Sequence, residues 1–152
     1  MELLRPSLVV PAGARLPASR AGTEATLLVV DDNEMNREVI SRFFESKGYT
    51  VTPAEGGQAA FEAVDALPVD LVMLDIMMPE ISGIDVLKWI RARRSVADLP
   101  VIMLTALDTE SDRIAGFAAG ADAYFLKPVD DAILFGRMDA LLSGEPAAAK
   151  VG

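Results

Sequence analysis

The sequence predicts an α/β fold in which parallel strands alternate with helices that cover both faces of the sheet. Short apolar runs recur along the chain, and segments with helical periodicity separate them. Parallel strands that are buried on both faces are typically apolar along their whole length, as these runs are. Hydrophobic residues make up 51% of the 152 residues, which is sufficient for one domain with a substantial core.

The apolar runs and the periodic segments between them predict five strand–helix units. The strands are expected at 27–30, 49–52, 71–75, 101–105 and 123–126. The helices are expected at 33–47, 57–66, 84–93, 111–119 and 130–142. Pro53 is expected to end the second strand. The inner face of the first helix is expected to hold Val39, Ile40, Phe43 and Phe44, and that of the second helix to hold Ala59, Ala60, Ala63, Val64 and Leu67.

The two ends of the chain differ in composition from the middle. Residues 1–24 contain three prolines and two glycines, which predicts a flexible N-terminal arm. The folded unit is expected to cover residues 25–142. Residues 143–152 are rich in Ala, Gly and Pro, which indicates a flexible tail or a linker.

Charge and residue usage exclude several classes of function. The formal net charge of −9 makes the chain by itself a poor binder of nucleic acid. The chain has no Cys and no His, so it cannot form a disulfide, a thiolate or imidazole metal site, or a Ser-His-Asp triad. No apolar stretch approaches the roughly 20 residues of a membrane span, and no signal peptide is evident. We therefore expect a cytoplasmic protein with no membrane partner, in which any phosphohistidine comes from another chain.

Polar residues follow four of the apolar runs at the point where each predicted strand ends. Asp31 and Asp32 follow the first run, Asp75 the third, Thr105 lies at the end of the fourth, and Lys127 follows the fifth. Ligands of open α/β sheets bind at the carboxyl ends of the strands, so these side chains are expected on one rim. Carboxylate oxygens without His or Cys favour Mg²⁺ or Mn²⁺ over Zn²⁺. Each Asp alone could instead be a helix cap or a turn residue, a simpler interpretation that weakens when all five positions are considered together.

Asp75 is the strongest candidate for a nucleophile. It follows the most continuously apolar strand, and a carboxylate there could attack a phosphoryl group to form an aspartyl phosphate. Lys127 and a divalent cation could neutralise the added charge, and Thr105 could donate a hydrogen bond to it. Asp70 precedes the same strand and is expected at the opposite edge of the sheet.

The segment from Ala25 to about Leu142 resembles the receiver domain of bacterial two-component response regulators. The resemblance covers, in order, Asp31-Asp32, Leu74-Asp75-Ile76-Met77-Met78-Pro79 with Gly83, Leu104-Thr105-Ala106, Gly120-Ala121-Asp122, and Tyr124 with Lys127-Pro128. It implies a doubly wound, flavodoxin-like sheet of five parallel strands in the order 2-1-3-4-5 with five helices.

The resemblance also implies a role for each site residue. Asp75 is the phosphoacceptor, and Asp32, Asp75 and the backbone carbonyl of Met77 bind Mg²⁺ directly, with Asp31 acting mainly through water. Thr105 contacts the phosphoryl oxygens, and Lys127 pairs with Asp75 or its phosphate. Thr105 and Tyr124 form the switch, in which Tyr124 turns inward and changes a protein-interaction face. The residues alone favour a half-buried Tyr124 with its hydroxyl in water. The Lys127–Pro128 peptide is often cis in this family.

The implied function is that of a phosphorylatable signalling switch rather than an enzyme that turns over a metabolite. The phosphoryl donor is a histidine kinase or a histidine phosphotransfer protein, and the output is a downstream protein or an attached domain; a homodimer is an open possibility. Met77 and Leu107 are both apolar, which predicts slow self-dephosphorylation. A dehalogenase-like phosphatase would need an acid at position 77, where Met77 stands. A receiver-like docking module that never uses phosphate is the remaining alternative, although it has no need for a costly cluster of acids.

Overall fold

The computed structural model describes residues 25–94, 98–106 and 109–143, and these ranges form one α/β unit. Its five strands are all parallel and lie in the order β2-β1-β3-β4-β5. The strands are β1 (Thr26–Val30), β2 (Thr50–Ala54), β3 (Leu71–Leu74), β4 (Val101–Thr105) and β5 (Ala123–Leu126). The helices of the described ranges are α1 (Glu34–Ser46), α2 (Gly57–Ala66), α3 (Gly83–Arg93), α4 (Glu110–Ala118) and α5 (Asp131–Leu142). The predicted fold class and the strand order are both confirmed.

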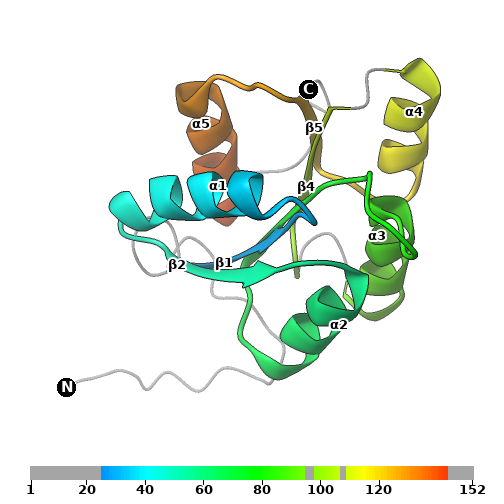
Figure 1. Ribbon diagram of the computed structural model, residues 1–152, viewed down its shortest axis with the longest axis horizontal. Helices are drawn as coiled ribbons and strands as arrows, with labels where there is room; N and C mark the ends of the chain where they lie inside the picture. The colour runs from blue at the N-terminus through cyan, green and yellow to red at the C-terminus, as the bar shows by residue number, and fades with distance from the viewer. Residues whose placement is uncertain (1–24, 95–97, 107–108, 144–152) are drawn as a thin grey trace.

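Helices cover the two faces of the sheet in two unequal layers (Figure 1). Helices α1 and α5 lie on one face, and α2, α3 and α4 lie on the other. Each layer has its own apolar core, because the strand residues alternate between the two faces. Strands β3 and β4 are buried at every position, which explains why their sequences are continuously apolar.

Polar side chains fix where four of the helices begin. The N-cap residues Asn33, Ser82, Thr109 and Asp130 each accept a hydrogen bond from a backbone N–H of the first helical turn. Such caps typically stabilise a helix by about 1 kcal/mol relative to alanine. Each of these caps follows a strand or a loop at the carboxyl ends of the strands. The caps therefore also determine where the loops at that rim of the sheet end.

Pro53 does not end the second strand, contrary to the prediction. It lies inside β2, opposite Val29 of β1. Ala54 accepts a hydrogen bond from Asp31, and Thr50 donates one to Ala25, so the even-numbered residues of β2 face β1. Pro53 therefore turns its nitrogen away from β1 at the free edge of the sheet, where no N–H is required.

Two predicted core positions are exposed. Val39 is 63% exposed, because the buried face of α1 is centred on Arg37, Ile40, Ser41 and Phe44, with the half-buried Phe43 beside it. The central positions follow the i, i+3, i+4, i+7 spacing of one helical face, and Val39 lies off it. Leu67 is 41% exposed, because it is the C-cap of α2 with extended backbone angles and has left the helical stripe.

The opposite rim of the sheet is held by buried carboxylates with a structural role. Asp70 accepts a hydrogen bond of 2.8 Å from the backbone N–H of Thr26, which confirms that it lies away from Asp75. Asp122 accepts one of 2.8 Å from Val101 and pairs with Arg91 at 3.0 Å. Trp89 on α3 stacks on Phe61 of α2. Within the described ranges, no helix combines the length and the apolar character that crossing a membrane requires.

Candidate functional site

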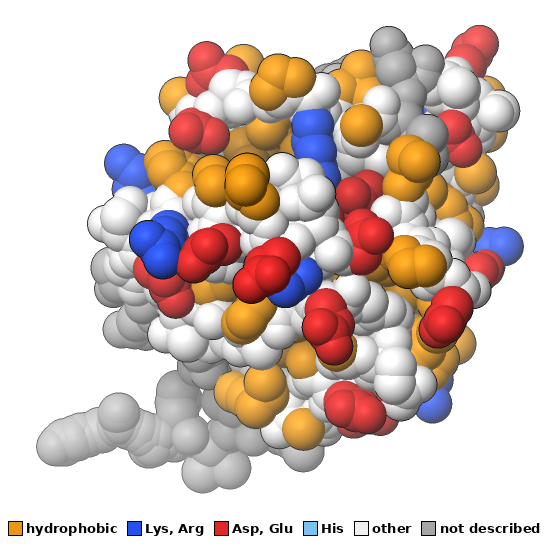
Figure 2. All heavy atoms as spheres, in the orientation of Figure 1, with side chains coloured by type: hydrophobic (Ala, Val, Ile, Leu, Met, Phe, Trp, Pro, Cys, Tyr) orange, Lys and Arg blue, Asp and Glu red, His pale blue; other side chains and the backbone are white. Residues whose placement is uncertain are grey.

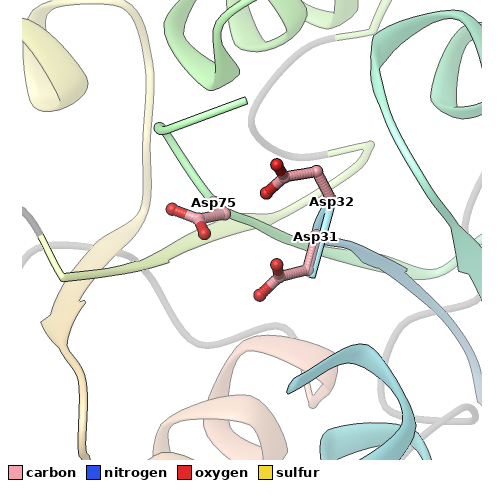
Figure 3. Close-up of side chains that lie close together, drawn as sticks. All are labelled: Asp31, Asp32 and Asp75. Carbon is pink, nitrogen blue, oxygen red and sulfur yellow. The ribbon is translucent and has the colours of Figure 1, made fainter. Parts of the chain in front are cut away.

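The register of the central strands brings the three predicted carboxylates together. Val30 of β1 pairs with Leu74 of β3, so Asp31 and Asp75 follow at the same level of the sheet. The backbone N–H of Asp75 donates to the carbonyl oxygen of Val30 at 3.1 Å, which continues the ladder to the rim. Figure 3 shows the carboxylates of Asp31, Asp32 and Asp75 pointing to the same side, beyond the ends of the strands. One carboxylate oxygen from each of the three lies within 4.8 Å of those from the others.

The three carboxylates differ in their contact with solvent. Asp31 is 2% exposed and Asp75 is 8% exposed, whereas Asp32 is exposed at the surface. Buried carboxylates are costly unless they are paired. The two buried ones therefore need a permanent counter-charge, and the exposed one does not.

Lys127 supplies that counter-charge from the end of β5. Its Nζ donates to Oδ2 of Asp31 at 2.7 Å and to Oδ2 of Asp75 at 3.1 Å. Burial alone lowers the pKa of Lys127, but the hydrogen bonds and the attraction from Asp31 and Asp75 outweigh it and raise the pKa above 10.5. Lys127 is therefore an ammonium at neutral pH.

The loop that carries Lys127 is fixed to the neighbouring strand. The backbone N–H of Lys127 donates to the carbonyl oxygen of Thr105 at 2.9 Å, and the Lys127–Pro128 peptide is cis, as expected. Thr105 lies at the end of β4 and is fully buried. The residue predicted to contact the phosphoryl group thus lies at the rim, one strand away from Asp75.

The loop after Asp75 folds back onto the acid that precedes it. The backbone N–H of Met77 donates to Oδ1 of Asp75 at 3.2 Å, while the Met77 side chain is 57% exposed. The N-terminus of α3 closes the loop, because Gly83 donates to the carbonyl oxygen of Ile76 at 2.9 Å. A Cβ at Gly83 would lie 2.0 Å from the backbone oxygen of Asp75, so only glycine permits this approach.

Tyr124 on β5 is directed inward. It is 1% exposed, so the expectation of a half-buried ring with its hydroxyl in water is wrong. Helix α4 forms its socket: the Arg113 guanidinium lies 5.5 Å from the ring centroid, and the Phe117 ring lies at 6.4 Å. Gly116 leaves the space that the ring occupies, since a Cβ there would lie 3.2 Å from Cδ2 of Tyr124.

The site suits a hard divalent cation. Three carboxylates and one ammonium leave a formal charge of −2, and the donors are all oxygens. Both features match Mg²⁺, which is typically held by one or two carboxylates together with phosphate oxygens. Acidic side chains also predominate over basic ones on the face shown in Figure 2.

The structure brings most of the predicted side chains together and adds contacts that the sequence did not indicate. The structure brings Asp31, Asp32, Asp75 and Lys127 together and places Thr105 at the adjacent strand end. Sequence reasoning missed that Asp31, rather than Asp75, makes the shorter contact with Lys127. It also missed Arg37, whose Nη1 donates to the carbonyl oxygen of Asp31 at 2.7 Å. The only available signal was an Arg five positions after the acidic pair.

Comparisons with known proteins agree with this geometry. Residues 27–139 match the model of the response regulator receiver domain family. The probable transcriptional regulatory protein TcrX of Mycobacterium tuberculosis is 41% identical over 123 residues, which are 80% of this chain and 51% of that protein. The response regulator MprA of Mycobacterium ulcerans is 42% identical over 116 residues, which are 76% of this chain and 49% of that protein. The chain thus spans about half the length of these relatives.

Solved structures with the same architecture include receiver domains. The receiver domain of the Francisella response regulator 1452 matches with a TM-score of 0.71 and 33% identity, over 78% of this chain and 96% of that one. A CheY-like receiver domain protein from Methanospirillum hungatei matches with a TM-score of 0.73 and 25% identity, over 78% and 93% of the two chains. Together with the strand order and the acidic rim, these matches show that the chain belongs to the family of response regulator receiver domains, the signalling domains of two-component systems.

Proposed function

We propose that this receiver domain accepts a phosphoryl group on Asp75. The observation that carries the proposal is the contact between Lys127 and both buried carboxylates, Asp31 and Asp75, beside the exposed Asp32. A carboxylate cluster of this kind is costly in the absence of charged ligands, so its presence favours a role in binding them. The matches to response regulators support the same role.

The transfer itself requires little chemistry from the protein. A carboxylate oxygen of Asp75 forms a bond to phosphorus while the P–N bond of the partner's phosphohistidine breaks, and the electron pair returns to the imidazole nitrogen. Lys127 stabilises the charge that Asp75 acquires, and Thr105 donates a hydrogen bond to a phosphoryl oxygen. Positioning and charge neutralisation of this kind dominate phosphoryl transfer.

Mg²⁺ is the cofactor that the site would hold. Asp32, Asp75 and the carbonyl oxygen of Met77 would bind it directly, and Asp31 would act mainly through water. When bound, the ion supplies positive charge next to the phosphoryl oxygens. The formal charge of −2 on the residues present is the balance that such an ion requires.

The partners follow from the residues that the chain lacks. Because the sequence has no His, the phosphohistidine must belong to a histidine kinase or a histidine phosphotransfer protein. The phosphorylated domain would then act on a downstream protein or an attached output domain, in the cytoplasm, without turning over a metabolite. Thr105 and the inward Tyr124 would transmit the change to the surface formed by α4, β5 and α5.

The phosphorylated form is expected to be long-lived. Met77, beside Asp75, is apolar and exposed, so it would not activate a water molecule for attack on the acyl phosphate. Leu107, the second residue behind this prediction, lies outside the described residues. We expect decay over minutes or longer in purified protein; a half-life of seconds would contradict this.

The proposal is tested by intact mass after incubation with acetyl phosphate, with and without Mg²⁺. We expect one Mg²⁺-dependent phosphoryl adduct on the wild type and none on Asp75→Asn. Asp70→Asn is the matched control, because Asp70 is a buried acid at the other end of the same strand and its amide replacement can still accept from Thr26. If neither acetyl phosphate nor a phosphorylated histidine partner labels the folded wild type, the phosphate-independent docking module becomes the better account.

A further inference from the structure

The carboxylate of Asp32 is held in place only through the backbone on either side of it. Asp31 and Asp75 are both fixed by Lys127, but Asp32 is exposed, and within the described ranges it has no hydrogen-bonded or ion-paired partner. The direction of its side chain therefore depends on the two peptide groups that flank its Cα atom. Whatever fixes those peptide groups sets the direction of the Cα–Cβ bond and so restricts the positions that this proposed magnesium ligand can reach.

Two side chains fix the two peptide groups. The backbone N–H of Asn33, on the C-terminal side, donates to Oδ1 of Asp31 at 2.8 Å. The carbonyl oxygen of Asp31, on the N-terminal side, accepts from Nη1 of Arg37 at 2.7 Å. Asp31 also donates its own N–H to Ala54 at 3.1 Å, so each of its polar groups is occupied.

The position of Arg37 in α1 makes this contact possible. Its backbone N–H donates to the carbonyl oxygen of the N-cap residue Asn33 at 2.9 Å, so Arg37 lies one turn into the helix. Side chains in helices lean toward the N-terminus, and a long one at this position reaches back over the first turn to the loop. The Arg37 side chain is half-buried, in contrast to the exposed Arg42 farther along the same helix.

We propose that Arg37 is a positioning residue for Mg²⁺, which holds the Asp31–Asp32 peptide so that the Asp32 carboxylate faces Asp75. This role rests on the proposed function, since it takes Asp32 as a ligand. Hydrogen-bond partners of metal ligands typically contribute 10- to 100-fold to metal affinity. The same order of effect is expected here, although Arg37 acts on the backbone of the ligand rather than on its carboxylate.

Electrostatics alone predicts the opposite result, which makes the inference easy to test. Arg37 carries a positive charge close to a cation site, so its removal should strengthen Mg²⁺ binding if charge were its only influence. A positioning role predicts weaker binding after the same substitution. The sign of the change therefore distinguishes the two explanations.

The test is Mg²⁺ binding measured by titration calorimetry on the wild type, Arg37→Met, Arg37→Lys and Arg42→Met. Arg42→Met is the matched control, because Arg42 lies on the same helix and, among the residues that the structure describes, pairs only with the exposed Glu38, at 2.8 Å. We expect Arg37→Met to weaken Mg²⁺ binding by about 10-fold or more, Arg37→Lys to recover part of the loss, and Arg42→Met to stay within about twofold of the wild type. Melting curves in EDTA check that each variant is folded. If Arg37→Met does not fold, the Mg²⁺ affinity of Arg37→Lys is compared with that of the wild type instead.

Each result has a distinct meaning. Unchanged or tighter binding by a folded Arg37→Met overturns the positioning role while the proposed function stands. Absence of Mg²⁺ binding by the wild type overturns the proposed function and this role with it. A second readout is the phosphorylation rate as a function of Mg²⁺: the positioning role raises the half-saturating concentration in Arg37→Met and leaves the maximal rate unchanged.

Discussion

Removal of the Lys127 ammonium should destabilise the domain and make its stability depend more strongly on magnesium. In Lys127→Met, the carboxylates of Asp31 and Asp75 lose the cation that lies 2.7 and 3.1 Å from them. The side chains of the two acids are only 3% and 10% exposed, so water compensates little. Breaking a buried ion pair by removing one partner typically costs about 3–5 kcal/mol. Because the Lys127 side chain is itself 19% exposed, we expect the lower end, about 3 kcal/mol, or about 10 °C in melting temperature.

The assay is urea denaturation of the wild type, Lys127→Met and Lys88→Met, each in EDTA and in excess Mg²⁺. Lys88→Met is the matched control, since Lys88 is an exposed lysine on α3 and its loss should change the free energy of unfolding by about 0.5 kcal/mol or less. Mg²⁺ should stabilise Lys127→Met more than the wild type, because the ion replaces the missing positive charge. A loss below about 0.5 kcal/mol in EDTA, or an equal loss in Lys88→Met, would refute the reasoning.

The same variant has a predicted pH dependence. The pKa of Lys127 is raised above 10.5 in the folded state, so its contribution to stability is fully present below that pH. The contribution is lost as the pH rises through the folded-state pKa. The difference in unfolding free energy between the wild type and Lys127→Met should therefore be constant from neutral pH to about pH 9.5 and should shrink at higher pH.

Further substitutions test the packing of the domain. Gly83→Ala should destabilise the domain by at least about 2 kcal/mol, because the added methyl group clashes with the loop after β3. Gly136→Ala on α5 has open space around the added methyl group and should stabilise the domain by about 0.5–1 kcal/mol. Urea denaturation measures both changes. Gly116→Ala should be more favourable by about 1–3 kcal/mol in a Tyr124→Ala background than in the wild type, and a double-mutant cycle without coupling would exclude the socket on α4. Arg91→Met should cost about 3–5 kcal/mol in thermal or urea unfolding by removing the cation that lies 3.0 Å from the buried carboxylate of Asp122, and a change below about 1 kcal/mol would contradict this.

The position of the candidate site could be predicted because residues that directly follow parallel strands lie on one rim of the sheet. Asp31, Asp75 and Lys127 each come directly after an apolar run, and the carboxyl ends of parallel strands share one rim whatever their order. The strand order itself came from the family resemblance and not from the residues. Local sequence patterns do not encode which strands lie next to one another in the sheet.

The errors concern features that only the assembled sheet determines. Pro53 is compatible with β2 because its nitrogen faces the free edge, and that orientation depends on the pairing with β1. Val39 was predicted to be buried because apolar residues occur in pairs along α1, but the buried face runs through Arg37 and Ser41. Tyr124 is buried because Gly116, on another element, leaves room for its ring. The outer segments of the predicted domain division, 1–24 and 143–152, lie outside the described residues except for Ser143.

The most direct test of the central claim is to locate the phosphorylated residue chemically. The protein is phosphorylated in the presence of Mg²⁺ and reduced with borohydride, which converts an aspartyl phosphate to homoserine, and the peptides are sequenced by mass spectrometry. The account predicts homoserine at position 75 alone, absent without Mg²⁺ and absent in Asp75→Asn. Homoserine at position 31 or 32, or an acid-stable phosphate on Thr105, would contradict it.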